Sequence, residues 1–147
     1  MEQLCQDWNG NQWENFYLYI FGYDTNNNII YDGQMSWQNN QWDSSQQIFY
    51  TYNANNKVTE RILQYFRNNQ WKNQQRYTYT YNTNGYELER IGFGWTDSIW
   101  VEANKRINTY DANNNLLINI NGSSKTTYTY DVLSFDIPRY NFYVNHS

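Results

Sequence analysis

The sequence predicts an all-β protein built from tandem β-hairpins, with consecutive strands forming an antiparallel meander. Two patterns support this fold class: a sequence repeat of 29 residues, and stretches in which Tyr alternates with Thr or Arg. In addition, no window shows a 3.6-residue apolar period flanked by helix-capping residues. A length of 147 residues fits one domain. We expect about nine or ten strands in a single curved or twisted sheet, solenoid-like or partly closed.

The repeat is visible in three sets of aromatic residues that share one spacing. Successive members lie 29 residues apart in each set: Trp13, Trp42, Trp71 and Trp100; Trp8, Trp37, Phe66 and Trp95; Tyr23, Tyr52, Tyr81 and Tyr110. A fixed period of this size is typical of proteins made of stacked supersecondary units. We expect one repeat domain over residues 1–131, with four full units and a shortened fifth, followed by a non-repeat C-terminal cap or tail over residues 132–147.

Each unit predicts two strands and two turns. The stretch RYTYTY (76–81) has the period of two and the aromatic and β-branched residues of a strand. Each pair of rings five residues apart, here termed a bracket, encloses a polar turn. Two-residue hairpin loops are therefore predicted at 10–11, 39–40, 68–69 and 97–98. Trp37 should then stack on Trp42, and Phe66 should contact Trp71, across adjacent strands, which would fix the register.

The repeated tyrosines open the other turn of each unit, as in YNANNK (52–57). A three-residue loop of Asn53, Ala54 and Asn55 would pair Tyr52 with Asn56, and an Asn or Gly at 26, 27, 55, 56, 84, 85, 113 or 114 would supply a left-handed residue. With this register, the brackets share one apolar face with Ile48, Tyr50, Tyr52 and Val58. We expect curling, a second layer or a partner to bury that face.

Composition and residue spacing restrict the classes of function. A net charge of −4 disfavours binding to nucleic-acid phosphates, and no apolar run approaches the roughly 18 residues of a membrane-spanning helix. The single histidine, His146, and the single cysteine, Cys5, are far apart in sequence. Asp24–Asn28 matches the start of a calcium loop, but the later Gly and Glu are missing, and turn chemistry explains its repetition. We therefore expect no enzyme activity, no cofactor, no metal and no membrane insertion.

The stretches YTYTYNTNGY (77–86) and WNGNQWEN (8–15) resemble tandem repeats of the form YTYDxNGN and WNGxW. Such repeats occur in large secreted proteins of Bacteroidetes, particularly flavobacteria, many of which are substrates of type IX secretion. The similarity extends over residues 8–131, and the Tyr-Asp motif is more weakly similar to the repeats of Rhs proteins. The resemblance implies an extracellular or cell-surface protein. Because the first residues, MEQLCQDWNG, do not resemble a signal peptide, we expect a processed form or a fragment.

Exposed Trp and Tyr offer stacking surfaces for sugar rings, and the many Asn and Gln offer neutral hydrogen bonds. We expect a non-enzymatic binding or adhesion module for a polysaccharide or a partner protein. Its candidate ligand-binding residues are Trp8, Trp13, Trp37, Trp42, Trp71, Trp95 and Trp100. Brackets two strands apart would recur every 9–10 Å or so, near the repeat of two sugars in an extended β-linked glycan. The alternative is that the rings form the core of a structural spacer or protein-interaction repeat, including a partner of a secretion system.

Overall fold

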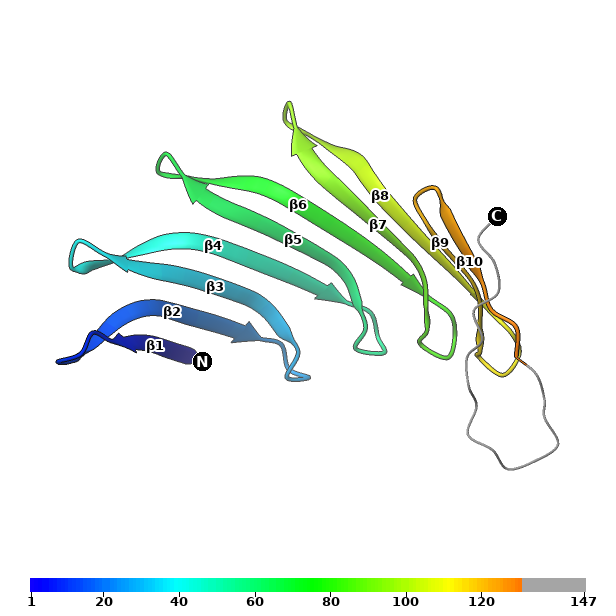
Figure 1. The fold of residues 1–147 in the computed structure, drawn as a ribbon, viewed down its shortest axis with the longest axis horizontal. Helices are drawn as coiled ribbons and strands as arrows, with labels where there is room; N and C mark the ends of the chain where they lie inside the picture. The colour runs from blue at the N-terminus through cyan, green and yellow to red at the C-terminus, as the bar shows by residue number, and fades with distance from the viewer. Residues whose placement is uncertain (131–147) are drawn as a thin grey trace.

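The computed structural model, described here for residues 1–130, is one sheet of ten antiparallel strands in sequence order (Figure 1). The strands are β1 (Glu2–Trp8), β2 (Trp13–Tyr23), β3 (Ile29–Gln38), β4 (Gln41–Tyr52), β5 (Val58–Arg67), β6 (Gln70–Tyr81), β7 (Glu87–Thr96), β8 (Ile99–Tyr110), β9 (Leu116–Asn121) and β10 (Ser124–Thr127). The described residues contain no helix, and β1 and β10 form two open edges. The predicted meander is confirmed as an open sheet; the predicted tail lies outside the described residues.

The four bracket turns occur at the predicted positions. Asn39 and Asn40 have φ angles of 50° and 61°. Positive φ at both central residues defines the type I′ turn, whose twist matches that of the flanking strands. Asn68–Asn69 and Asp97–Ser98 repeat this geometry, whereas the first turn uses Gly10 with a φ of 98°. Asn, Asp and Gly tolerate this region best, so the polar residues inside the brackets determine where the chain reverses.

The loops at the other end are longer than predicted. Tyr52 pairs with Val58 instead of Asn56, so five residues, 53–57, form the loop. The Asn53 side-chain oxygen accepts hydrogen bonds from the backbone nitrogens of Asn55 (2.9 Å) and Lys57 (3.0 Å). The predicted left-handed residue is Asn56, with a φ of 56°. Equivalent bonds are made by the residues that open the other three loops, Asp24, Asn82 and Asp111. This first side chain sets the loop length.

Two β-bulges in each repeat overturn the predicted grouping of side chains on the faces. Gln34 pairs with Gln46 but Met35 pairs with Ser44, which leaves Ser45 as an extra residue. Thr59 is extra in the same way between β4 and β5. Cross-strand partners share a face, and one extra residue reverses the alternation along its strand. The brackets therefore lie on one face, termed the bracket face. The opposite, tyrosine face carries the residues that were predicted to join them, Ile48, Tyr50, Tyr52 and Val58.

Neither face is covered by a second layer within residues 1–130. Ile48 and Leu63 are the only buried apolar side chains there, at 8% and 9% exposure. Gln47 and Asn108 are buried polar side chains. The second layer or curled closure that the apolar residues suggested is thus absent from the described part of the chain. Its strands are held instead by backbone pairing and by side chains that bridge neighbouring strands.

The repeated tyrosines bridge the strands on the tyrosine face. The hydroxyls of Tyr52, Tyr81 and Tyr110 donate to the carbonyls of Ile29 (2.8 Å), Val58 (2.7 Å) and Glu87 (2.9 Å). Each acceptor begins the preceding strand. Burial raises the pKa of all three tyrosines, so each hydroxyl keeps its donor proton.

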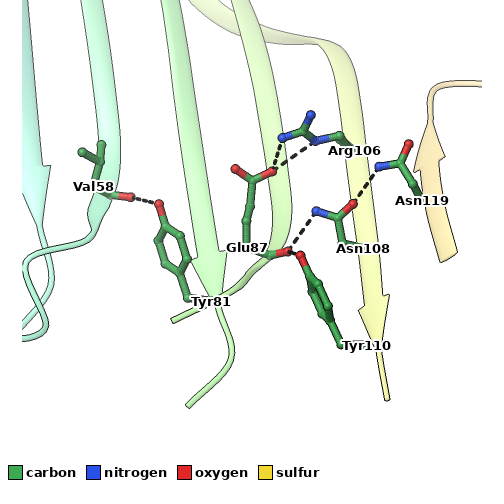
Figure 2. A network of polar contacts seen from close by, with 7 residues as sticks. All are labelled: Val58, Tyr81, Glu87, Arg106, Asn108, Tyr110 and Asn119. Carbon is green, nitrogen blue, oxygen red and sulfur yellow. Dashed lines mark hydrogen bonds and ion pairs between the residues drawn. The ribbon is translucent and has the colours of Figure 1, made fainter. Parts of the chain in front are cut away.

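Figure 2 shows the tyrosine bonds of two repeats and the polar network beside them. The Glu87 carbonyl also accepts a hydrogen bond from the Asn108 amide (2.9 Å), and Asn108 in turn accepts one from Asn119 (2.7 Å). The Glu87 carboxylate pairs with Arg106 at 2.7 Å. One residue at the start of β7 therefore joins β7, β8 and β9.

Removing one tyrosine hydroxyl should destabilise the sheet. We predict that Tyr81→Phe lowers the free energy of unfolding by about 1 kcal/mol, because the Val58 carbonyl loses its donor. Tyr77→Phe is the matched control, since the Tyr77 hydroxyl makes no hydrogen bond within residues 1–130. Urea denaturation followed by circular dichroism measures both. Equal stability of the two variants would contradict a structural role for the tyrosine bonds.

Candidate functional site

The predicted contact within each bracket is confirmed, but the rings do not stack in parallel. The Trp37 and Trp42 ring centroids are 4.9 Å apart with an interplanar angle of 64°, and those of Phe66 and Trp71 are 5.1 Å apart at 65°. The Trp8–Trp13 and Trp95–Trp100 pairs have the same edge-to-face arrangement. The two-residue turns place each pair at a non-hydrogen-bonded position, where side chains come closest. Edge-to-face packing is a favourable geometry for aromatic pairs.

All seven candidate tryptophans lie on the bracket face, and none is buried. Trp8 and Trp13 are the most exposed, at 55% and 64%, and Trp95 is 36% exposed. Trp37, Trp42, Trp71 and Trp100 are half-buried. The rings therefore do not form a closed core among residues 1–130. They pack against their partners and keep part of their surface accessible.

Each bracket lies near the tip of its hairpin. The strands at the tip are not paired with the neighbouring hairpins. Pairing between β4 and β5 ends at Gln46–Tyr65, and pairing between β6 and β7 ends at Gln75–Gly94. Beyond these points each hairpin is a two-stranded ribbon, and the tips fan out (Figure 1). The bulge residues Ser45 and Gln74 lie where this pairing ends. The predicted spacing of 9–10 Å or so assumed pairing along the whole strand and does not apply to the tips.

Two shallow hollows adjoin the third bracket. One, of about 340 Å³, lies between the tip of β3 and β4 and the end of β5, and its lining includes Ser36, Asp43, Tyr65 and Phe66. The other, of about 290 Å³, is lined on the bracket face by Tyr31, Gly33, Met35, Gln47 and Trp71. Phe66 and Trp71 thus each line one hollow. The sequence predicted Trp71 as a ligand-binding residue and Phe66 only as its bracket partner, and it gave no sign of the hollows beside them.

Gly33 shapes the hollow on the bracket face. A Cβ atom at this position would collide with the Tyr31 ring. The absent side chain therefore allows the ring to lie across β3. The Tyr31 hydroxyl is 3.5 Å from the Gln47 side-chain oxygen. Space at a glycine and an aromatic wall together produce a concave patch on the bracket face.

Neutral amides continue from this hollow across the bracket face. Gln47 donates to the Gln64 side-chain oxygen at 2.6 Å, and Gln64 donates to Asn73 at 2.7 Å. Every residue that lines this hollow is uncharged. The nearest ion pair on the same face, Glu60–Arg76, is satisfied within itself at 2.6 Å. Aromatic surface beside neutral donors and acceptors suits a ligand with apolar C–H faces and many hydroxyl groups.

The other chemical groups that the sequence singled out are not brought together. Cys5 is half-buried in β1, and His146 lies outside the described residues. The Asp24 carboxylate accepts hydrogen bonds from the backbone of Asn26 and from the backbone and side chain of Asn28. Residues 1–130 contain no group of three His, Cys, Asp or Glu side chains that could hold a metal ion. Nor does this part of the chain form an apolar helix long enough to cross a membrane.

No protein-family model and no curated protein match the sequence, but solved structures have a similar fold. A crystal structure of a DUF3836 family protein from Bacteroides vulgatus has a TM-score of 0.51 and 19% identity, over 59% of this chain and 90% of that one. A protein of unknown function from Bacteroides fragilis has a TM-score of 0.54 and 15% identity, over 91% of both chains. A DUF3836 family protein from Parabacteroides distasonis has 23% identity over 54% of this chain and 74% of its own, with a TM-score of 0.46. The first two likenesses show that the fold occurs in Bacteroides proteins.

The edge-to-face indoles should give exciton-coupled circular dichroism. We predict that Trp42→Ala weakens the couplet, because it removes one of three Trp–Trp pairs. Trp71→Ala is the matched control, since its partner is Phe66 and not a second indole. A couplet that is unchanged in Trp42→Ala would contradict the contact between Trp37 and Trp42.

The first loop should open in acid. Hydrogen bonds from the Asn28 side chain and backbone lower the pKa of Asp24. A lowered pKa contributes stability above the ordinary Asp pKa, and that contribution is lost as the pH falls through the folded-state value. We predict that the amide signals of Asn26 and Asn28 shift in this acid range. The equivalent loop at 53–57 begins with a neutral Asn, which does not titrate, so the Asn55 and Lys57 amides are the internal control. If both loops shifted together, the change would not come from Asp24.

Proposed function

We propose that this protein is a non-enzymatic extracellular binding module for neutral polysaccharide, with the third bracket at the centre of its ligand surface. One observation carries the proposal. Phe66 and Trp71 remain partly exposed on the bracket face, and Trp71 borders a hollow on that face that is lined only by uncharged groups.

The chemistry of a sugar fits this surface. The C–H face of a pyranose ring packs on an aromatic ring, and its hydroxyls exchange hydrogen bonds with amides and phenols. Trp71 supplies the ring, and Tyr31, Gln47 and Gln64 supply neutral donors and acceptors within the same patch. An uncharged lining favours neutral over acidic glycans, because a carboxylate or sulfate would lose hydration here without gaining a cation.

The repeated brackets suit a polymer better than a single sugar. Four hairpin tips carry equivalent pairs on one face, so a chain that crosses the strands can meet several of them (Figure 1). Linked weak contacts raise the overall affinity, because the second contact forms at high effective concentration. The resemblance to secreted repeats supports an extracellular or cell-surface location and export by type IX secretion.

A structural spacer or protein-interaction repeat is the second candidate function. The observation that favours it is the regularity of the sheet itself: the bulge near the tip recurs in all four full units and the bridging tyrosine bond in three of them, as expected of an element that sets distance and shape. In this alternative the brackets only fix the register of their hairpins. Direct binding measurements separate the two functions.

Calorimetric titration against soluble β-glucan, chitin oligosaccharides and mannan tests the proposal. We predict binding to at least one neutral polymer, and about tenfold weaker binding by Trp71→Ala, which corresponds to about 1.4 kcal/mol. Val101→Ala is the matched control, because Val101 is 46% exposed near a hairpin tip but lies on the tyrosine face. If no polymer of the panel bound, the spacer function would be favoured. Equal losses of affinity in both variants would show that the ligand does not bind on the bracket face.

A further inference from the structure

Within residues 1–130, strand β1 ends the sheet, and one side of its backbone is unpaired. The Asn9 nitrogen donates to the Gln12 carbonyl (3.1 Å) at the turn, and the Phe21 nitrogen donates to the Met1 carbonyl (2.8 Å) at the other end. Hydrogen-bonded and non-hydrogen-bonded positions alternate between these points. The backbone groups of Gln3, Cys5 and Asp7 therefore point toward β2. Those of Glu2, Leu4, Gln6 and Trp8 point outward.

This edge has few of the features that usually protect an edge strand against pairing. Natural proteins block exposed edges with proline, lysine, bulges or very short strands. β1 has seven residues, contains neither proline nor lysine, and has its bulge on the partner strand, at Phe16. Six of its seven residues are exposed. The opposite edge, β10, has only four residues.

We propose that β1 pairs with β1 of a second copy of this chain, antiparallel and about a twofold axis through Cys5. Residues whose backbone groups point outward in one copy must pair with outward-pointing residues in the other copy. The possible registers therefore differ from one another by shifts of two residues. Only one register then pairs all seven residues: Glu2 with Trp8, Gln3 with Asp7, Leu4 with Gln6, and Cys5 with itself. The next registers place Leu4 or Gln6 on the axis and leave part of β1 unpaired.

The register that pairs all seven residues brings no like charges together and keeps equivalent faces of the two copies on the same side. β1 carries two charged side chains, Glu2 and Asp7, and neither faces an acidic residue, so like charges do not oppose each other across the strands. Paired residues share a face, so the bracket faces of both copies continue on the same side of one longer sheet. The inference stands on the edge geometry and does not require the proposed glycan function. One short strand pair is a small interface, and we therefore expect weak, reversible association.

Thiol cross-linking tests the register. Two Cys5 residues on the axis occupy a non-hydrogen-bonded pair with Cα atoms about 4.5 Å apart, which lies within the range of about 4.4–6.8 Å that disulfides span. Diamide, as oxidant, takes up the two protons and two electrons released when the thiols join. We expect covalent dimers of the native chain, and none with Cys5→Ser.

Mixed cysteine variants make the test specific to the register. In a Cys5→Ser background, Gln3→Cys chains should cross-link with Asp7→Cys chains but not with each other, because position 3 faces position 7. Gln6→Cys chains should not cross-link with themselves, because position 6 faces position 4. Cross-linking of Gln6→Cys or of Gln3→Cys alone, at the rate of the mixed pair, would overturn the proposed pairing.

A proline scan tests the edge itself by sedimentation. Leu4→Pro removes an outward amide, so it should keep the circular dichroism spectrum of the native chain and abolish the dimer. Gln3→Pro removes an amide that points toward β2, so it should perturb the sheet. A native chain that stays monomeric up to about 1 mM, where even a millimolar interface is populated, would overturn the proposal. So would a dimer that survives Leu4→Pro.

Discussion

The hydrogen-bonded ladder between consecutive strands is the interaction on which the rest of this structure depends. In most domains, apolar burial supplies the main stabilisation, and strand pairing follows from it. Here Ile48 and Leu63 are the only apolar side chains buried within residues 1–130. The ladder must therefore be reinforced locally, strand by strand. The bridging tyrosines do this at one end of the strands, and the aromatic brackets do it at the other.

The β-bulges decide which chemistry each face presents. If β4 alternated regularly through Ser45, with no bulge, the brackets and the tyrosines would lie together on one apolar face, which would need a cover. With it, the tyrosines turn to the opposite face, where their hydroxyls reach backbone carbonyls, and the brackets keep a face of their own. Pairing between hairpins also stops beside the bulges, which frees the tips. One backbone irregularity per hairpin thus links the stability of the sheet to the accessibility of its candidate site.

Local features of the sequence were sufficient for the hairpins. Asn39 and Asn40 predicted a two-residue turn, the turn predicted the contact of Trp37 with Trp42, and the period extended this to every unit. The five-residue loops also have a sequence signal, the Asp or Asn at the first position of each loop. A side-chain acceptor at that position satisfies two later backbone amides and so favours a longer loop.

The faces could not be predicted, because the bulges leave no consistent residue type. The equivalent bulge positions near the tips are Phe16, Ser45, Gln74 and Ala103, which share neither size nor polarity. The candidate site was predictable as a set of aromatic residues. Its hollow was not, because it depends on how the Tyr31 ring lies over Gly33 and on the ending of pairing between neighbouring hairpins. Both are properties of the assembled sheet.

Native-state hydrogen exchange, followed residue by residue by NMR, tests most directly whether the sheet is a single layer stabilised by its ladder. The structure predicts the strongest protection where the strands are paired on both sides, around Ile48 and Leu63. It predicts a fall in protection toward β1 and β10, and faster exchange in the bracket tips beyond Ser45 than in the same strands nearer the tyrosine bonds. Uniform protection that includes the tips and both edges would contradict the account, because it would require a covering layer or one cooperative core.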